Sequence, residues 1–272
     1  MYRRKPAVAG SFYPSNPQRL GVMIDSFLSE AGGAASGENV VGVISPHAGY
    51  VYSGPVAAHA FHRIPAGTEL VIVLAPSHRA RFNGAAILDE GVFETPLGDV
   101  AIDAEIGSRL RGRDYFGPIR EAHELEHSLE VQVPFLQKVL KSFTLVPIIV
   151  GTVDIAVCRG IAEGIHAVLA GEKRKYAVVI STDLSHYHSY EEARALDKRF
   201  SDALKTFDEK KVEDVVRRAK AEACGEGPVL TGMVLCRLLG AKSVEILKYA
   251  NSGDTAGSKD QVVGYLAAAF VK

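Results

Sequence analysis

Short, continuous apolar runs alternate with helix-like segments along most of the chain. The runs 40–44, 70–75, 145–150 and 177–180 consist mainly of Val, Ile, Leu and Ala. Strands that are apolar on both sides are typical of parallel sheets that are buried on both faces. The pattern therefore predicts an α/β fold with a central, mostly parallel or mixed sheet and helices on both faces.

Proline and capping residues indicate where several elements begin. Asn16 is a predicted N-cap, and Pro17 follows it at the first helical position. A second, short helix is expected from about 55 to 63. Pro147 lies inside the run 145–150, and proline in a strand indicates an edge strand or a bulge. The two apolar segments near the carboxyl terminus are expected to form an antiparallel pair.

Length and composition narrow the functional classes. The 272 residues contain no internal repeat and suit a single domain over 1–272. The 31 Lys and Arg residues balance 32 Asp and Glu residues, so we expect no nucleic-acid partner. The longest apolar run, 262–271, is half the length of a membrane helix, which needs roughly 20 residues. Without a secretory leader, the expectation is a cytoplasmic protein that binds no membrane, with homo-oligomerisation left open.

Histidine follows three predicted strands at the points where they end. The strand ends read Ser-Pro-His47, Pro-Ser-His78 and Ser-Thr-Asp183-Leu-Ser-His186. The carboxyl ends of parallel strands meet at one edge of a sheet, where ligands bind. Neutral imidazole is a common protein ligand for Zn, Cu, Fe and Ni. We therefore predict a functional site around His47 and His78.

Asp183 and His186 leave two interpretations open. They are three residues apart, so they could form a carboxylate–imidazole pair that orients a general base or supports a metal ligand. Asp183 is explained equally well as the cap of a following helix. Histidines inside predicted helices are expected to have structural roles; these are His59, His62 and His166.

Cys224 has the most suggestive surroundings of the three cysteines. It lies in Ala-Cys224-Gly-Glu-Gly-Pro228, directly before a predicted helix. A helix amino terminus stabilises a thiolate, and glycine lets a ligand approach closely. Cys224 is therefore a candidate metal ligand or nucleophile, with a small buried side chain as the alternative. Cys158 and Cys236 fall in helical patterns and are expected to pack in the core.

The string His123-Glu-Leu-Glu-His127 matches the zinc-protease pattern His-Glu-x-x-His. Its polar surroundings indicate a loop instead of the helix that the pattern requires. A zinc hydrolase would follow if both imidazoles faced the same way, because zinc would then activate a bound water.

Several strings together resemble the Memo family, which is named for a mediator of receptor-driven cell motility in animals and also occurs in archaea and bacteria. The resemblance extends from the amino terminus past Cys224. The matching strings lie at 4–13, 46–54, 75–78, 126–137, 181–186 and 224–225.

The resemblance implies a fold similar to that of class III extradiol dioxygenases, which hold non-haem Fe(II) with two histidines and a glutamate. By that analogy His47, His78 and Cys224 are the metal ligands, and Asp183 and His186 act as acid/base groups or support the ligands. The His127 string then forms pocket wall or a structural motif. A thiolate in place of the glutamate favours Cu or Zn, but it can also hold Fe(II). Because the dioxygenases use Fe(II), the resemblance implies iron or copper, with zinc as the alternative.

The residues and the resemblance together leave three functions open. The first is a metal-dependent oxidoreductase, although a thiolate ligand argues against ring cleavage. The second is a non-catalytic module whose pocket binds a peptide or a small anion. The third is a zinc-dependent hydrolase. In each case the partner is a small molecule or peptide held in the pocket.

Overall fold

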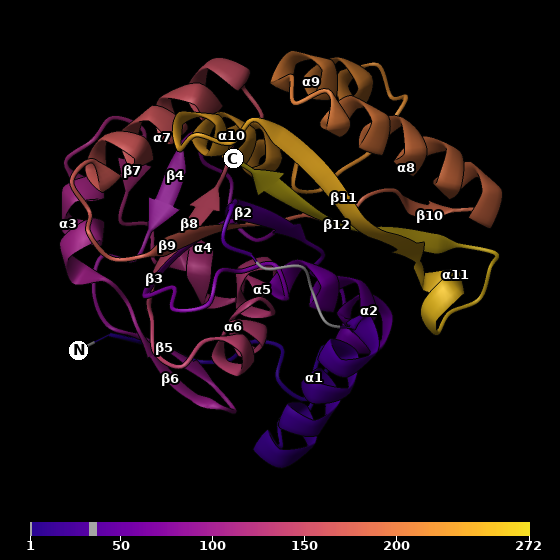
Figure 1. Ribbon diagram of the computed structural model, residues 1–272, viewed down its shortest axis with the longest axis horizontal. Helices are drawn as coiled ribbons and strands as arrows, with labels where there is room; N and C mark the ends of the chain where they lie inside the picture. Colours follow the sequence, from indigo (N-terminus) through magenta and orange to yellow (C-terminus); the bar gives the residue numbers. More distant parts are fainter. Residues whose placement is uncertain (1, 33–36) are drawn as a thin grey trace.

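The computed structural model describes residues 2–32 and 37–272, in which strands and helices alternate (Figure 1). The strands are β1 (Arg3–Arg4), β2 (Val40–Ser45), β3 (Leu70–Pro76), β4 (Ala85–Ile87), β5 (Val92–Thr95), β6 (Gly98–Ala101), β7 (Phe116–Gly117), β8 (Thr144–Val150), β9 (Tyr176–Ser181), β10 (His186–His188), β11 (Ser243–Asn251) and β12 (Val262–Val271). The helices are α1 (Pro17–Ala31), α2 (Tyr50–Phe61), α3 (Ala104–Arg111), α4 (Glu121–Glu124), α5 (His127–Glu130), α6 (Val133–Val139), α7 (Ile155–Leu169), α8 (Tyr190–Lys205), α9 (Glu209–Arg217), α10 (Glu226–Leu238) and α11 (Ser252–Thr255).

The larger sheet has the strand order β10-β12-β2-β9-β3-β8-β4-β7, and β11 pairs with β12. Its centre, β2-β9-β3-β8, is parallel throughout. Antiparallel pairs adjoin this centre on both sides, at β12 and at β4. The predicted mixed α/β sheet is therefore confirmed, as is the antiparallel pairing of β11 with β12. A smaller sheet, β1-β5-β6, lies beside α6 (Figure 1).

Both faces of the central sheet are covered because successive side chains of a strand point to opposite faces. In β3, positions 70, 72 and 74 pack with α3, α7 and α10, whereas positions 71, 73 and 75 pack with α1, α2 and α6. Every residue of β3 is buried. Burying each aliphatic side chain contributes roughly 1.5–3 kcal/mol, so this double-sided core holds the strand ends firmly in place.

Two expectations about proline are corrected by the structure. The helix expected over 55–63 begins at Tyr50, so Pro55 lies inside α2. Proline cannot donate to the carbonyl four residues earlier, at Val51, a residue that is half exposed. Pro147 does not lie in an edge strand either, because β8 lies between β3 and β4 in the sheet. Pairing with β4 starts at Ile148, so Pro147 precedes that ladder.

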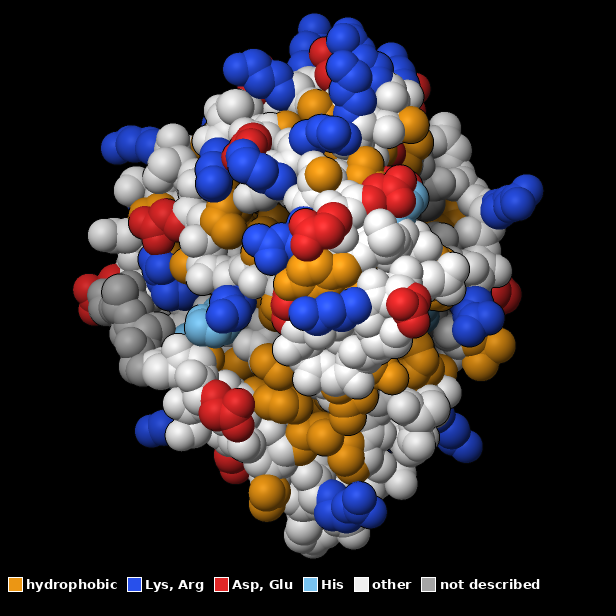
Figure 2. All heavy atoms as spheres, turned by 90° about the vertical axis from the view of Figure 1, so that its right-hand side faces the viewer, with side chains coloured by type: hydrophobic (Ala, Val, Ile, Leu, Met, Phe, Trp, Pro, Cys, Tyr) orange, Lys and Arg blue, Asp and Glu red, His pale blue; other side chains and the backbone are white. Residues whose placement is uncertain are grey.

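The outer surface divides into polar and apolar regions. On the face shown in Figure 2, Lys and Arg side chains gather at the top, and apolar side chains gather in the lower half, toward α1 and α2. Val22 on α1 and Val51 and Tyr52 on α2 are among the exposed apolar residues. Within the described residues, no helix is both long and apolar enough to cross a membrane.

Candidate metal centre

The parallel pairing of β2, β9 and β3 brings three loops to one edge of the sheet. Ser45 at the end of β2 pairs with Ser181 at the end of β9. Leu74 of β3 pairs with Ile180 of β9, so β3 ends at the same level. His47, Asp183 and His78 follow these ends and therefore lie on neighbouring loops at the carboxyl edge, as the sequence predicts.

The tautomer of His47 follows from its hydrogen bonds. His47 is 2% exposed, and its Nδ1 lies 2.8 Å from Oγ of Ser181. That hydroxyl donates its only proton to the carbonyl of Ser128 at 2.7 Å and accepts from Nε2 of Gln132 at 2.9 Å. It can therefore only accept from His47, which must carry its proton on Nδ1. Nε2 of His47 is left with a free lone pair for a metal.

The buried carboxylate of Glu126 determines the tautomer of His78. Glu126 accepts from the backbone amide of His78 at 2.6 Å, from Nδ1 of His78 at 2.9 Å and from the amide of Ser128 at 3.0 Å. Burial raises the pKa of Glu126, but the His78 and Ser128 hydrogen bonds outweigh it and lower that pKa to about 2. The ionised carboxylate holds the His78 proton on Nδ1, so Nε2 is again available.

His127 completes a group of three imidazoles. Its ring centroid lies 5.5 Å from that of His47 and 4.7 Å from that of His78, and the last two centroids are 5.3 Å apart. One nitrogen of each ring lies within 4.8 Å of the others, an arrangement that could hold a metal ion. Burial lowers the pKa of His127 to about 4 and that of His47 well below its usual value, so both rings are neutral at pH 7.

Cys224 contacts the group of three imidazoles at His47. Its Sγ lies 3.1 Å from Nε2 of His47, so the thiol donates to the free lone pair. Asp183 accepts from the backbone amide of His47 at 2.7 Å, and the amide of Asp183 lies 3.3 Å from the same sulfur. Burial raises the pKa of Asp183 to about 7 and also raises that of the Cys224 thiol. The pKa of the half-buried His186 is lowered by its own burial, and it is near enough to His47 to lower that pKa too.

The structure thus brings together four of the residues that the sequence analysis assigned to the site, His47, His78, Asp183 and Cys224, and places His186 near enough to His47 to affect its pKa. Their separate roles as ligands and acid/base groups remain predictions. The sequence analysis assigned no role to Gln132 or Ser181, because only the hydrogen bonds from Gln132 to Ser181 and from His47 to Ser181 reveal one.

The two histidines of the protease-like string, His123 and His127, lie in different environments. α4 ends before Glu126 and α5 begins at His127, so the string is not one helix. His123 is buried with Nε2 3.2 Å from the carbonyl of Ala86, and burial lowers its pKa to about 3. The zinc-protease arrangement is therefore not formed, and His127 joins His47 and His78 instead.

The amino-terminal segment forms hydrogen bonds and an ion pair with the segment that contains Glu126 and His127. Arg4 is 1% exposed and is ion-paired with Glu130, which is fully buried. Its guanidinium also donates to the backbone carbonyls of His123 and Glu126. The Glu130 carboxylate in turn accepts from the amides of Ala7 and Val8 and from the Tyr13 hydroxyl. The segment 4–13 thus binds the chain around Glu126 by hydrogen bonds that involve backbone groups of both segments.

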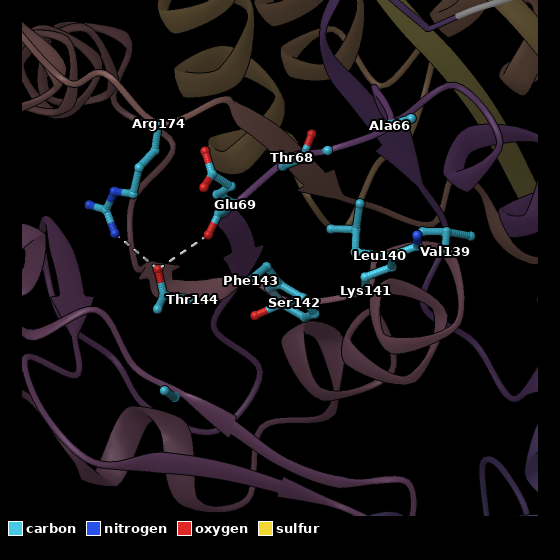
Figure 3. Close-up of a pocket in the computed structure, with 12 residues that line it drawn as sticks. Ala66, Thr68, Glu69, Val139, Leu140, Lys141, Ser142, Phe143, Thr144 and Arg174 are labelled. Atoms are coloured by element: carbon cyan, nitrogen blue, oxygen red, sulfur yellow. Dashed lines mark hydrogen bonds between the residues drawn. The ribbon is translucent and has the colours of Figure 1, made fainter.

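A cavity of about 680 Å³ lies at the opposite edge of the sheet from the histidines, where β3 and β8 begin. In Figure 3, Arg174 and Glu69 lie on either side of Thr144. The guanidinium of Arg174 is paired with Asp103 at 2.6 Å and with Glu172 at 2.7 Å. Its charge is already neutralised, and the histidines lie at the other end of these strands, so the histidine edge is the better candidate site.

An α/β sheet with three imidazoles gathered at its carboxyl edge defines a candidate metal-binding protein. Comparison with known proteins narrows that class. A family model described as Memo-like protein matches residues 4–269. The chain belongs to the Memo family.

Relatives with similar sequences come from archaea. A MEMO1 family protein of Methanopyrus kandleri is 39% identical over 278 residues, with 98% of each chain covered. One of Sulfolobus acidocaldarius is 39% identical over 282 residues, covering 98% of this chain and 99% of its own. One of Aeropyrum pernix is 40% identical over 279 residues, covering 96% and 97%. The similarity therefore extends over essentially the whole chain.

Proposed function

We propose that this protein binds one iron or copper ion at His47 and His78 and acts as a metal-dependent oxidoreductase. The observation that carries the proposal is the fixed tautomer of both imidazoles, which leaves a lone pair on Nε2 of each ring at one edge of the sheet. A third donor is at hand in Cys224 or His127. Imidazole with thiolate suits iron, copper and zinc.

The residues around the ligands suit a redox site. The bound metal would supply electron transfer to or from a substrate. Glu126 and Ser181 orient the ligand rings, because each accepts the Nδ1 proton of one histidine. Asp183 lies behind His47, with Oδ1 on its backbone amide, and is placed to hold a proton near the reacting atoms. His186, half-buried nearby, is the second candidate for proton transfer.

A zinc hydrolase is the second candidate function. It is favoured by the three imidazoles, because three histidines with an open fourth position form a catalytic zinc site that activates water in known zinc enzymes. Zinc does not change oxidation state, so the identity of the metal separates the two functions.

Metal analysis of anaerobically purified protein tests the proposal, followed by oxygen-consumption measurements with a chemical reductant. We expect about one equivalent of iron or copper per chain and oxygen uptake above that of the metal-free protein. Zinc as the bound metal, with hydrolysis of a test ester, would replace the oxidoreductase by the hydrolase. No metal, and no uptake on reconstitution with Fe(II), Cu or Zn, would leave a non-catalytic binding module.

Glu126→Gln is expected to weaken metal binding by about 10- to 100-fold, the range for loss of an outer hydrogen-bond partner. The amide no longer holds the Nδ1 proton of His78 by charge. Competition with a metal chelator measures the affinity. Glu124→Gln, an exposed position three residues from His127, is the matched control and should bind normally. Equal affinities in both variants would contradict the role of Glu126.

A further inference from the structure

A cavity of about 280 Å³ adjoins the candidate metal centre at the carboxyl edge of the sheet. It lies between the loops that follow β3 and β8 and the first turn of α10, which contribute Ser77, Thr152 and Gly227. Crevices at the carboxyl ends of parallel strands are where α/β proteins bind ligands. Cys224 lines this cavity, and its sulfur lies 3.1 Å from Nε2 of His47. A molecule in the cavity is therefore next to the metal ligands.

Arg81 is the only charged residue in the lining of this cavity, among the residues that the structure describes. It forms no ion pair within the described chain, and neither does the neighbouring Arg79. By contrast, Arg174 in the larger cavity is paired with two carboxylates. An uncompensated guanidinium at a concave surface attracts an anion and binds carboxylate or phosphate through two parallel hydrogen bonds.

The rest of the lining suits a small organic molecule. Phe82 and Val150 offer apolar surface, and Thr152 offers a hydroxyl. The volume of about 280 Å³ is just below the usual range for small-molecule sites, about 300–1,000 Å³. The cavity is too small for a folded partner, so the ligand that matches it has a few carbon atoms and a negative charge.

We propose that this cavity binds the substrate of the metal centre and that the substrate carries a carboxylate or phosphate held by Arg81. This inference rests on the proposed function for its reaction, because the metal is taken to act on the part of the substrate nearest Cys224. Arg81 is then a specificity residue: it selects anionic substrates and sets which end of the molecule faces His47.

The test uses metal-free protein and calorimetric titration with inorganic phosphate, with acetate and with neutral acetamide. We expect one of the two anions to bind and acetamide not to bind. Arg81→Gln should weaken anion binding about tenfold, the effect of one unit charge a few ångströms away in a partly solvated site. Arg109→Gln, an exposed arginine on α3 without an ion pair among the described residues, is the matched control and should bind as the wild type does.

Alkylation of Cys224 by iodoacetamide, followed by mass spectrometry, locates the anion; the reaction is run at alkaline pH, because burial raises the pKa of this thiol and only the thiolate reacts. Bound anion should slow this reaction in the wild type and not in Arg81→Gln. Protection by phosphate assigns a phosphate-bearing substrate, and protection by acetate assigns a carboxylate. The proposal is overturned if neither anion binds, or if Arg81→Gln binds as tightly as the wild type. Because no metal is present, this failure is separate from failure of the proposed function.

Discussion

Replacing His47 with alanine is expected to abolish metal binding. His47 is one of the two imidazoles whose tautomer leaves a lone pair on Nε2, and it lies against Cys224 and the other two imidazoles. Loss of an outer partner costs 10- to 100-fold in affinity, so loss of the ligand itself should cost more than about 100-fold. Metal analysis of the purified variant, with a circular dichroism spectrum to confirm folding, measures the effect. His166→Ala on α7 is the control and should keep its metal.

Two further variants decide which side chain is the third ligand. If Cys224 is the ligand, Cys224→Ser should lose iron or copper while His127→Ala keeps it. If the three imidazoles hold the metal, the result is reversed, because Cys224 then only donates to His47. Metal content unchanged in His47→Ala would place the metal elsewhere and contradict both assignments.

The central strands and the edge that carries the site could be predicted because both depend on local sequence. Continuous apolar runs indicate strands buried on both faces, and parallel strands bring the residues after them to one edge. His47, His78 and Asp183 lie there for that reason. The start of α2 could not be predicted, because proline is usually read as the start of a helix, and Pro55 lies inside one.

The residues that orient the ligands could not be predicted either. Ser181 ends a strand and Gln132 lies between two short helices, so nothing in their sequence positions indicates a shared histidine. Their roles come from tertiary contacts between segments about 50 or more residues apart. The same holds for His127, whose pairing with His123 by spacing is misleading. The chain between them breaks into two helices and turns the rings to different environments.

The segment 4–13 shows how a string far from the site in sequence can still support it. Arg4 donates to the backbone carbonyl of Glu126, and the side chain of Glu126 holds His78. Phe12, from the same segment, has its ring centroid 5.0 Å from that of His127. The amino terminus therefore supports two of the three imidazoles, one through a hydrogen bond and one through packing.

Arg4→Ala is accordingly expected to lower the free energy of unfolding by about 3–5 kcal/mol, the cost of leaving one member of a buried ion pair without its partner. Glu130 is 0% exposed in the wild type, so its carboxylate loses its counter-ion at a buried site. The amides of Ala7 and Val8 and the Tyr13 hydroxyl still donate to it, but they carry no positive charge. Urea-induced unfolding, followed by circular dichroism, gives the free energy.

The neighbouring Arg3 provides a control of the same residue type in the same strand. It pairs with Glu94 and Asp99, but its side chain is 48% exposed, so Arg3→Ala should cost much less than Arg4→Ala. A double variant, Arg4→Met with Glu130→Gln, removes both buried charges and should be more stable than Arg4→Ala alone. Equal losses for Arg3→Ala and Arg4→Ala would show that burial of the pair does not determine its contribution. The link from the amino terminus to Glu126 would then rest on the backbone contacts alone.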